Sequence, residues 1–294
     1  MELQQLRYVI AVAEERNFTR AAARCFVVQS ALSHQIKALE RELGVILFAR
    51  TSRRVELTAA GEAFLTAARQ SVEAAERAVT DATAATTGHL TGELLIGMIP
   101  TVTVIDIPAT LRDFRERHPG VQIRLRGGSS DEFLPQIRDG LLDVAVLGLA
   151  ETSPPQRVAS QILARERHVA VVGAEHRLAS RRRLRLSELA DETFVDFPAG
   201  GTGRIPTDAA FAAAGLHREV TFEASAPDMI LDLVRHGLAV TLLPPAVVPV
   251  DPALRTIPVT GGPVRVTHLA WSDFNPSPTT LAFLELAQHH LDQT

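Results

Sequence analysis

Five polar side chains between residues 29 and 37 have the types and the spacing needed to read DNA. Gln29, Ser30, Ser33, His34 and Lys37 recur with the spacing that lies along one side of an α-helix. A glutamine amide can bond adenine through two hydrogen bonds, serine can serve either kind of base edge, and lysine or protonated histidine can meet phosphate. For an isolated helix, the alternative is a polar face that contacts only water.

The flanking residues favour DNA binding over that alternative. A short helix and a tight turn precede this segment, and the basic run Arg50-Thr51-Ser52-Arg53-Arg54 follows it. A basic hairpin tip beside a recognition helix can reach flanking phosphates or the narrow minor groove. The predicted DNA contacts are Thr19, Gln29, Ser30, Ser33, His34, Lys37, Arg50, Arg53 and Arg54.

A second group of candidate residues lies on three loops of the C-terminal part. The loops are Met98–Val102, Gly128–Glu132 and Ala199–Arg204, and each precedes a predicted helix. Ligands of open α/β sheets bind beyond the strand C-termini, near helix N-termini whose free N–H groups attract anions. We therefore predict a cleft for a small, anionic effector. Its predicted residues are Ile99, Pro100, Thr101, Val102, Ser129, Ser130, Leu147, Gly201, Thr202, Gly203, Arg204 and Phe222.

Each polar candidate of these loops also has a purely structural explanation. Ser129-x-x-Glu132 is an ordinary capping box, and Thr101 and Thr202 can be helix caps. Arg204 can clamp a carboxylate, but it can equally form a surface salt bridge. These alternatives stay open on the sequence alone.

Three helices must position the DNA-reading face. Apolar residues recur with helical spacing over residues 3–13, and Asn17 or Thr19 can cap a second helix that is rich in alanine. A third helix carries one apolar stripe and ends at Gly44. The stripe consists of Leu32, Ile36, Leu39 and Leu43. These elements and the basic hairpin predict a winged helix-turn-helix.

Residues 59–88 predict a long linker helix. Thr58 can cap it, the chain contains no proline as far as Thr87, and Gly88 ends it. Its apolar seam is narrow and consists mostly of alanine, so pairing with a second copy of the chain is the expected source of stability. Such a homodimer would place two recognition helices about one turn of DNA apart. The alternative is a helix that packs on its own domain.

From residue 92 onward the pattern alternates between strands and helices, which predicts parallel α/β sheets in two lobes. The predicted strands are 93–98, 121–127, 144–149, 167–172, 193–197, 219–223, 239–243 and 264–273. The predicted helices are 107–117, 130–139, 207–214, 227–235 and 279–290. The whole chain is therefore expected to be α+β, with a mainly α N-terminal part and a C-terminal α/β part.

Composition sets further bounds on function. The net charge of −4 argues against general nucleic-acid affinity, but residues 1–60 contain nine basic and six acidic side chains.

The single cysteine, Cys25, excludes an intramolecular disulfide, and its expected role is a small apolar core residue rather than a redox sensor. The ten histidines have no metal-binding spacing, so neither a metal nor a cofactor is expected. No apolar run is long enough to span a membrane, and a cytoplasmic location is expected.

Enzymatic function is the weakest alternative. Gly201-Thr202-Gly203, with Glu223 about twenty residues later, imitates a dinucleotide-binding fingerprint, but Pro206 stands where the third glycine belongs. A nucleophile elbow and a Walker loop are both missing from the sequence. We therefore expect no catalysis. A stronger alternative is a constitutive repressor whose α/β part only dimerises.

Residues 1–65 resemble the DNA-binding domain of LysR-type transcriptional regulators. The similarity rests on three runs: Phe18-Thr19-Arg20-Ala21-Ala22, Gln29-x-Ala31-Leu32-Ser33-x-Gln35-Ile36-x-x-Leu39-Glu40, and Leu43-Gly44-Val45-x-Leu47-Phe48-x-Arg50 followed by Leu57-Thr58-x-x-Gly61. A looser similarity continues through Gly97-x-x-Pro100, Phe114-x-x-x-His118-Pro119, Gly140-x-x-Asp143, Ala214-Gly215 and Gly237-Leu238-Ala239-Val240.

The resemblance implies a domain order and a function. A DNA-binding domain (1–58) and a linker helix (59–88) would precede an effector domain (89–294) with a periplasmic-binding-protein-like fold. Its first lobe would span 92–161 and 267–294, and its second lobe 162–266. The implied function is ligand-responsive regulation of transcription on double-stranded promoter DNA. The implied partners are a small co-inducer, further copies that build a dimer or tetramer, and RNA polymerase.

Two residues depart from the family pattern. The family usually has serine or threonine at Val28 and proline at Ser30. Valine cannot cap a helix, whereas proline in the first turn would preset its φ angle. We therefore expect Ser30 to cap the recognition helix, which would then begin slightly later.

Overall fold

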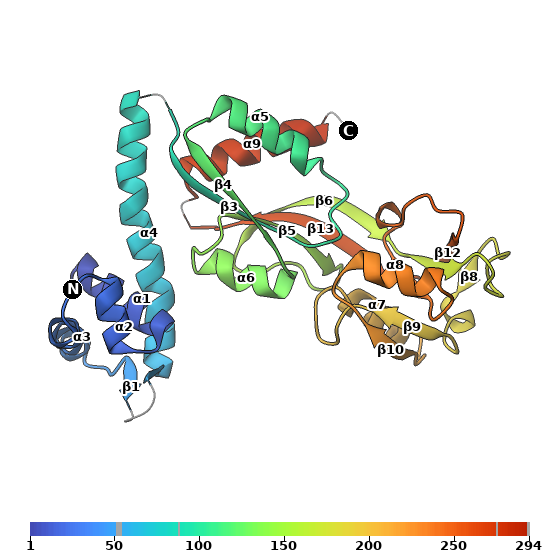
Figure 1. Ribbon diagram of the computed structural model, residues 1–294, viewed down its shortest axis with the longest axis horizontal. Coiled ribbons are helices and arrows are strands. Elements are labelled where there is room, and N and C mark those ends of the chain that lie inside the picture. The colour runs from blue at the N-terminus through green and yellow to red at the C-terminus, as the bar shows by residue number, and fades with distance from the viewer. Residues whose placement is uncertain (51–54, 88, 275, 293–294) are drawn as a thin grey trace. The chain divides into compact units, whose positions relative to one another are not determined.

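The computed structural model describes residues 1–294 except 51–54, 88, 275 and 293–294 (Figure 1). The side chains of Arg50, Arg77 and residues 79–87 also lie outside the description. The chain forms two compact units. The N-terminal unit contains Met1–Leu90 with Arg138–Leu141, and the C-terminal unit contains Thr91–Ile137 and Leu142–Thr294.

The N-terminal unit is a helical domain with a short hairpin. Its elements are α1 (Leu3–Glu15), α2 (Phe18–Arg24), α3 (Gln29–Leu43), β1 (Phe48–Arg50), β2 (Val55–Leu57) and α4 (Ala59–Thr87). The strands β1 and β2 pair antiparallel. Side chains from α1, α2, α3 and β1 form one core, in which Val9, Ala21, Leu32, Ile36 and Leu39 are fully buried. The predicted winged helix-turn-helix is therefore confirmed.

Local capping explains where the helices begin. The Asn17 side chain accepts hydrogen bonds from the backbone of Thr19 and Arg20, so Asn17 caps α2. The Thr58 hydroxyl accepts a bond of 3.0 Å from the Gly61 N–H at the start of α4. The prediction that Ser30 caps α3 is wrong, because the helix already begins at Gln29 and Val28 occupies the cap position without a side-chain hydrogen bond.

The helix α4 contains 29 residues and rises about 43 Å. It packs against α1, and it contributes Leu65 and Ala68 to the buried residues. Its described residues from Ser71 to Glu76 are partly buried or exposed. The alternative of packing on its own domain therefore applies to the first turns of the helix.

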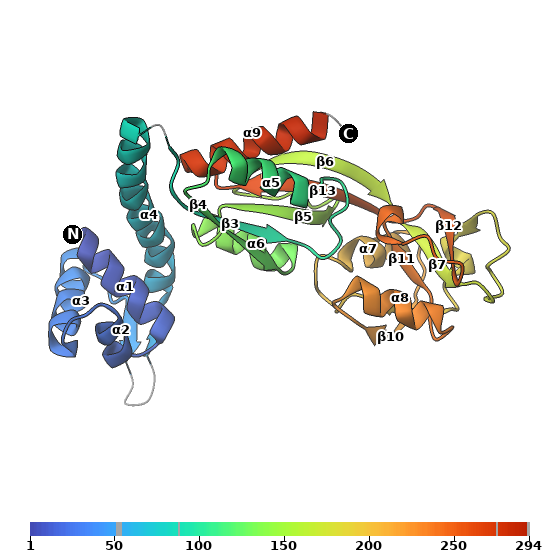
Figure 2. The same ribbon diagram turned by 45° about the horizontal axis from the view of Figure 1, so that its top comes forward.

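The first lobe of the C-terminal unit is a sheet with the strand order β4-β3-β5-β13-β6. Its strands are β3 (Gly92–Met98), β4 (Val121–Gly127), β5 (Val144–Ala150), β6 (Ala159–Arg167) and β13 (Val264–Trp271), and its helices are α5 (Ile107–Arg117), α6 (Ser130–Arg138) and α9 (Pro278–Asp292). Figure 2 shows α5 and α9 on one face of the sheet and α6 on the other. Every residue of β5 is buried.

The second lobe is built on two smaller sheets. Their strand orders are β11-β7-β12-β8 and β10-β9, and a bridge between Phe194 and Val240 joins them. The strands are β7 (Val169–Gly173), β8 (Leu184–Arg185), β9 (Thr193–Asp196), β10 (Glu219–Glu223), β11 (Thr241–Leu243) and β12 (Leu254–Thr260), and the helices are α7 (Ile205–Ala213) and α8 (Pro227–Arg235). The short 3-10 turns are Leu186–Glu188 and Pro245–Val247.

The sheets differ from the predicted parallel arrangement. The strand β13 runs antiparallel to β5 and β6, and β7 runs antiparallel to β11 and β12. The sequence did not predict β6, β8 or β12. Because β6 and β13 pair along their whole length, from Ala159 with Trp271 to Arg167 with Val264, both belong to the first lobe. The chain therefore passes between the lobes at about residues 168 and 261–263, whereas the predicted boundaries fall inside these two strands.

Candidate DNA-binding and ligand-binding sites

The exposed face of α3 carries the predicted DNA-reading side chains. Gln29, Ser30, His34 and Lys37 are exposed and Ser33 is partly exposed. On the opposite stripe of α3, Leu32, Ile36 and Leu39 are buried in the domain core, whereas Leu43 at the end of the helix is exposed. Thr19 is exposed at the start of α2. Arg50 lies on β1, and the predicted contacts Arg53 and Arg54 lie outside the described residues. DNA contacts by the individual residues stay predictions.

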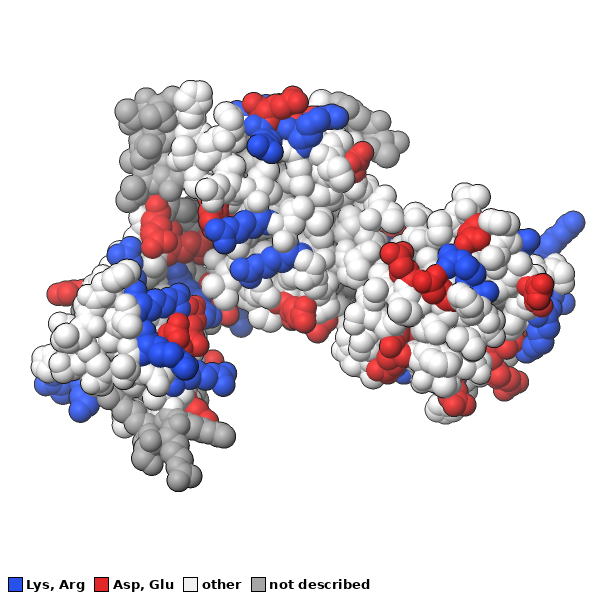
Figure 3. Space-filling view, viewed as in Figure 1, with Lys and Arg blue, Asp and Glu red and all other residues white. Residues whose placement is uncertain are grey.

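Other basic residues of this unit are balanced internally. Arg24 pairs with Glu14 at 2.6 Å, and Arg20 pairs with Glu15 at 3.2 Å. Figure 3 shows basic and acidic side chains close together on the visible face of the unit. These ion pairs offset the positive charge of Arg20 and Arg24 within the unit.

The sequence analysis missed an apolar pair beside α3. Phe26, in the turn before α3, is 96% exposed, and Val28 at the helix start is 68% exposed. Apolar side chains at a recognition helix can contact the methyl group of thymine. A φ of 56° is rare for a bulky side chain such as Phe26, and the sequence pattern does not reveal this backbone conformation.

Cys25 behaves as a structural residue. Its side chain packs against the core of the N-terminal unit. Burial raises the pKa of its thiol, and the nearby charge of Arg24 opposes this only in part. A protonated thiol is a poor nucleophile, so these features support the apolar role.

The predicted loops meet at a cavity of about 880 Å³ between the two lobes of the C-terminal unit. Eight of the twelve predicted residues lie on its wall: Ile99, Pro100, Thr101, Ser129, Ser130, Gly201, Thr202 and Gly203. Further wall residues include Phe197, Ser225, Pro244 and the backbone of Gly148. The loops therefore converge from both lobes.

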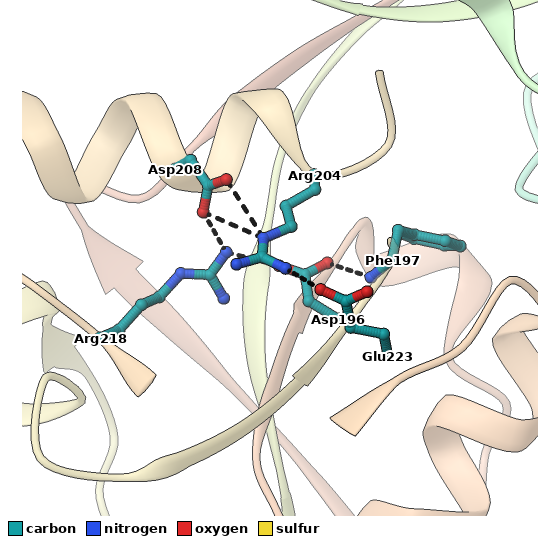
Figure 4. A network of polar contacts seen from close by, with 6 residues as sticks. All are labelled: Asp196, Phe197, Arg204, Asp208, Arg218 and Glu223. Atoms are coloured by element: carbon teal, nitrogen blue, oxygen red, sulfur yellow. Dashed lines mark hydrogen bonds and ion pairs between the residues drawn. The ribbon is translucent and has the colours of Figure 1, made fainter. Parts of the chain in front are cut away.

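Four predicted residues do not line this cavity. Leu147 is fully buried in the core of the first lobe, and Val102 packs against the same core. Phe222 packs against the core of the second lobe. Arg204 binds Glu223 at 2.6 Å and Asp208 at 3.1 Å, which corrects its predicted role as a carboxylate clamp in favour of the salt-bridge alternative (Figure 4).

The hydroxyl groups of the predicted site are bonded within the protein. Thr101 accepts a hydrogen bond from Arg265, and Ser130 bonds the backbone of Gly148. Thr202 donates its hydroxyl to Asp131 Oδ1 at 2.9 Å and its backbone N–H to the same oxygen at 3.2 Å. These last two bonds join the lobes across the cavity. The Ser129 N–H is bonded to Glu132 Oε2 at 3.0 Å, which is half of the expected capping box.

Two buried residues that the sequence analysis missed complete the wall. Arg265 on β13 is 6% exposed and bonds Glu166 Oε2 at 2.7 Å, and His168, which follows β6, is 3% exposed. Burial and the charge of Arg265 lower the pKa of His168 to about 3, so its ring is neutral. Among the described residues, no hydrogen-bond partner is found for either ring nitrogen of His168 or for the Nε of Arg265. An arginine inside the apolar run Val264–Trp271 was the available sequence signal.

A buried ion pair positions the loop from Phe197 to Gly203. Asp196, at the end of β9, accepts a bond of 2.7 Å from the Phe197 N–H and pairs with Arg218 at 2.7 Å (Figure 4). Burial raises the pKa of Asp196, and the charge of Arg218 offsets this only in part. Arg218 also contacts the rings of Phe194 and Phe211, at 4.9 and 5.3 Å from its guanidinium carbon.

Comparison with known families identifies both units. The model of the bacterial regulatory helix-turn-helix protein of the lysR family matches residues 3–62, and the model of the LysR substrate binding domain matches residues 87–292. The chain belongs to the LysR family of transcriptional regulators.

Individual relatives agree with this LysR-family assignment. The chain is 37% identical over 252 residues to the uncharacterized HTH-type transcriptional regulator YnfL of Escherichia coli, covering 83% of this chain and 82% of the relative. It is 36% identical over 248 residues to a probable hydrogen peroxide-inducible genes activator of Mycobacterium avium, covering 84% and 78%. The crystal structure of full-length CbnR complexed with its target DNA superposes with a TM-score of 0.63 and 27% identity, over 99% of this chain and 100% of CbnR.

Family membership decides between the broad classes of function. This LysR-family protein is a DNA-binding transcriptional regulator with a substrate-binding domain, and its relatives are not enzymes. Within the described residues, no helix is both long and apolar enough to cross a membrane. The same residues contain no cluster of three or more histidine, cysteine or acidic side chains that could hold a metal ion.

Proposed function

We propose that this LysR-family regulator changes transcription when a small organic molecule binds in the cavity between its two lobes. The observation that carries the proposal is the cavity itself. Its volume of about 880 Å³ is that of a small-molecule site, and its wall holds buried polar groups without partners within the described protein, on His168 and Arg265. Buried polar groups normally have partners, and a bound ligand would supply them.

The proposed mechanism is linkage between ligand binding and lobe closure. The bonds from Thr202 to Asp131 connect the lobes, so a ligand that alters this connection has different affinities for open and closed arrangements. Only such a difference in affinity shifts the equilibrium. The shift would reach the DNA through the spacing of two recognition helices in an oligomer.

The oligomer and its partners are further parts of the proposal. Pairing of α4 between two copies would build a dimer on a partly palindromic promoter site, and two dimers would form a tetramer. RNA polymerase is the expected partner at the promoter, and the cytoplasm is the expected location. The predicted residues of α3, together with Arg50, Arg53 and Arg54, are the proposed DNA contacts.

A cysteine-based sensor is not part of the proposal. The Mycobacterium avium relative is named for induction by hydrogen peroxide. In this chain the single cysteine is Cys25, which lies in the helix-turn-helix and packs against its core. A thiol in the substrate-binding domain therefore cannot mediate the response.

The test measures operator affinity of the full-length protein across a metabolite library. The operator is first isolated by sequencing the genomic DNA that the protein retains. We expect at least one compound to change the affinity or the DNA bend, and Thr202→Ala to lose this response. Thr221→Ala, on an exposed part of β10 outside the cavity wall, is the matched control and should keep it. Unchanged affinity and bend with every compound would instead favour the constitutive repressor.

A further inference from the structure

The charges on the cavity wall oppose an anionic ligand. Among the described wall residues, the ionisable side chains are Asp131, Glu132, His168 and Arg265. His168 is neutral, and the guanidinium of Arg265 already lies 2.7 Å from the carboxylate of Glu166. The wall therefore carries two carboxylates and one guanidinium whose charge is already balanced by Glu166. Charges in a partly enclosed cavity interact more strongly than charges in water.

The chain's own carboxylates occupy three hydrogen-bond donors of the cavity wall. Asp131 accepts both the N–H and the hydroxyl of Thr202, and Glu132 accepts the N–H of Ser129. Burial opposes ionisation of Asp131, but the hydrogen bonds from Thr202 prevail and lower its pKa. Asp131 is thus ionised at neutral pH. A carboxylate ligand would have to displace these groups and then lie beside their negative charges.

A buried polar group without a partner among the described residues, the Nε of Arg265, lies near the start of α6. Ser130, between Ser129 and Asp131, bonds Gly148, and a Cβ atom at Gly148 would lie 3.0 Å from Arg265 Cδ. The Arg265 side chain therefore passes directly over Gly148, close to the start of α6. The unpartnered Nε of Arg265 and the unpartnered ring of His168 are independent signs of a ligand at this wall.

We propose that the cavity selects an organic amine, whose protonated nitrogen meets Asp131 and Glu132 and whose uncharged acceptor group meets Arg265 or His168. The apolar part of the ligand contacts Phe197 and the neighbouring apolar wall. The inference rests on the proposed ligand cavity and names the class of ligand that it takes. It replaces the anionic effector that the sequence predicted.

The test compares three probes that differ in charge: 4-hydroxybenzylamine, 4-hydroxybenzyl alcohol and 4-hydroxybenzoate. Their dissociation constants for the full-length protein are measured by ligand-observed NMR titration. We expect the amine to bind at least about tenfold more tightly than the benzoate, with the alcohol between them. Asp131→Asn keeps an acceptor oxygen for Thr202 but removes the charge, and it should reduce the ratio of amine to benzoate affinity at least about threefold.

Controls separate the possible outcomes. Glu151→Gln removes a carboxylate that pairs with Arg165 on the surface, outside the cavity wall, and should leave the ratio unchanged. Glu132→Gln provides a second test of the acidic pair if Asp131→Asn does not fold. Benzoate binding as tightly as the amine, or a ratio that neither acidic-pair variant lowers, would overturn the amine inference and leave the ligand cavity intact. Absence of binding by all three probes, together with no response to the metabolite library, would overturn both.

Discussion

Replacement of Arg218 by methionine removes the cation of a buried ion pair while keeping an aliphatic side chain between Phe194 and Phe211. The side chains of Arg218 and Asp196 are 3% and 1% exposed and lie 2.7 Å apart. Removal of one partner from a buried pair typically costs about 3–5 kcal/mol, because the other charge stays buried without compensation. We expect a loss of this size in the free energy of unfolding of the second lobe at neutral pH.

The loss should depend on pH, and its sign follows from Asp196. Burial already raises the pKa of this carboxyl in the folded protein, and loss of the Arg218 charge should raise it further. A carboxyl whose pKa is higher in the folded state binds more protons when folded, so stability falls as the pH rises from the unfolded pKa, about 4, through the folded pKa. The deficit of Arg218→Met relative to the parent protein should therefore be small near pH 4 and grow towards neutral pH.

Native-state hydrogen exchange with mass spectrometry measures this effect locally. The reporters are the backbone N–H groups of Val195 and Val240, which bond Val240 and Thr193 across the bridge between the two sheets. Arg204→Met is the matched control. Its partners Asp208 and Glu223 are 48% and 45% exposed, and Asp208 also pairs with Arg218 at 2.7 Å. The loss for Arg204→Met should therefore not exceed about 1 kcal/mol.

A double variant completes this experiment. Asp196→Asn in the Arg218→Met background removes the uncompensated charge and keeps an acceptor for the Phe197 N–H, so most of the lost stability should return. Equal losses in Arg218→Met and Arg204→Met, or a deficit independent of pH, would refute the reasoning.

Three further predictions concern single positions. His168 has a folded pKa of about 3, below its unfolded value, so the parent protein should lose stability as the pH falls below about 6.5, by up to about 1.4 kcal/mol per pH unit. Urea unfolding should show His168→Phe to be less acid-sensitive, and equal sensitivity would contradict the buried neutral ring. In operator-binding assays, Gln29→Ala should reduce the discrimination between bases at one base pair by about 1–3 kcal/mol. Lys37→Ala should instead lower the affinity for every DNA sequence and make that affinity less dependent on salt concentration. An equal loss of affinity for all DNA sequences in Gln29→Ala would contradict a base-reading role for Gln29. Phe26→Gly should raise the free energy of thermal unfolding by about 1 kcal/mol, because glycine adopts the φ of 56° without strain and the side chain that is lost is 96% exposed. A lower melting temperature of the variant would show that this turn is not strained.

Local patterns predicted the helical elements well, because each depends on neighbours within a few residues. The stripe of Leu32, Ile36 and Leu39 fixed the face that α3 buries, and hence the face that it exposes. The start of α3 was predicted wrongly, because the helix begins at Gln29 with Val28 in the cap position, although valine offers no capping side chain. The strand β6 was missed because polar residues dominate its sequence and its alternation is interrupted at residues 163–164, so the segment looks like a polar loop.

The candidate ligand site was also predictable only in part. The loops were predictable, because each connects a strand to a helix at the edge of a sheet. The use of their hydroxyl groups was not predictable, because Thr202 and Asp131 are 71 residues apart and meet only across the lobes. The charged and polar groups that the cavity wall presents therefore depend on contacts between distant residues, and not on the residue types within one loop.

The sequence by itself determined the family, the order of the helix-turn-helix and substrate-binding domains, and which face of α3 stays exposed, because periodicity and local motifs encode these features. The tertiary structure decided which side chains face the cavity and with what charge. Arg265 and Glu166 are 99 residues apart, and the pairing of β13 with β6 brings them together. Burial then makes His168 neutral and leaves its ring nitrogens without partners in the described protein. Burial and long-range pairing arise only when the chain folds, so the chemistry of the ligand site depends on the fold.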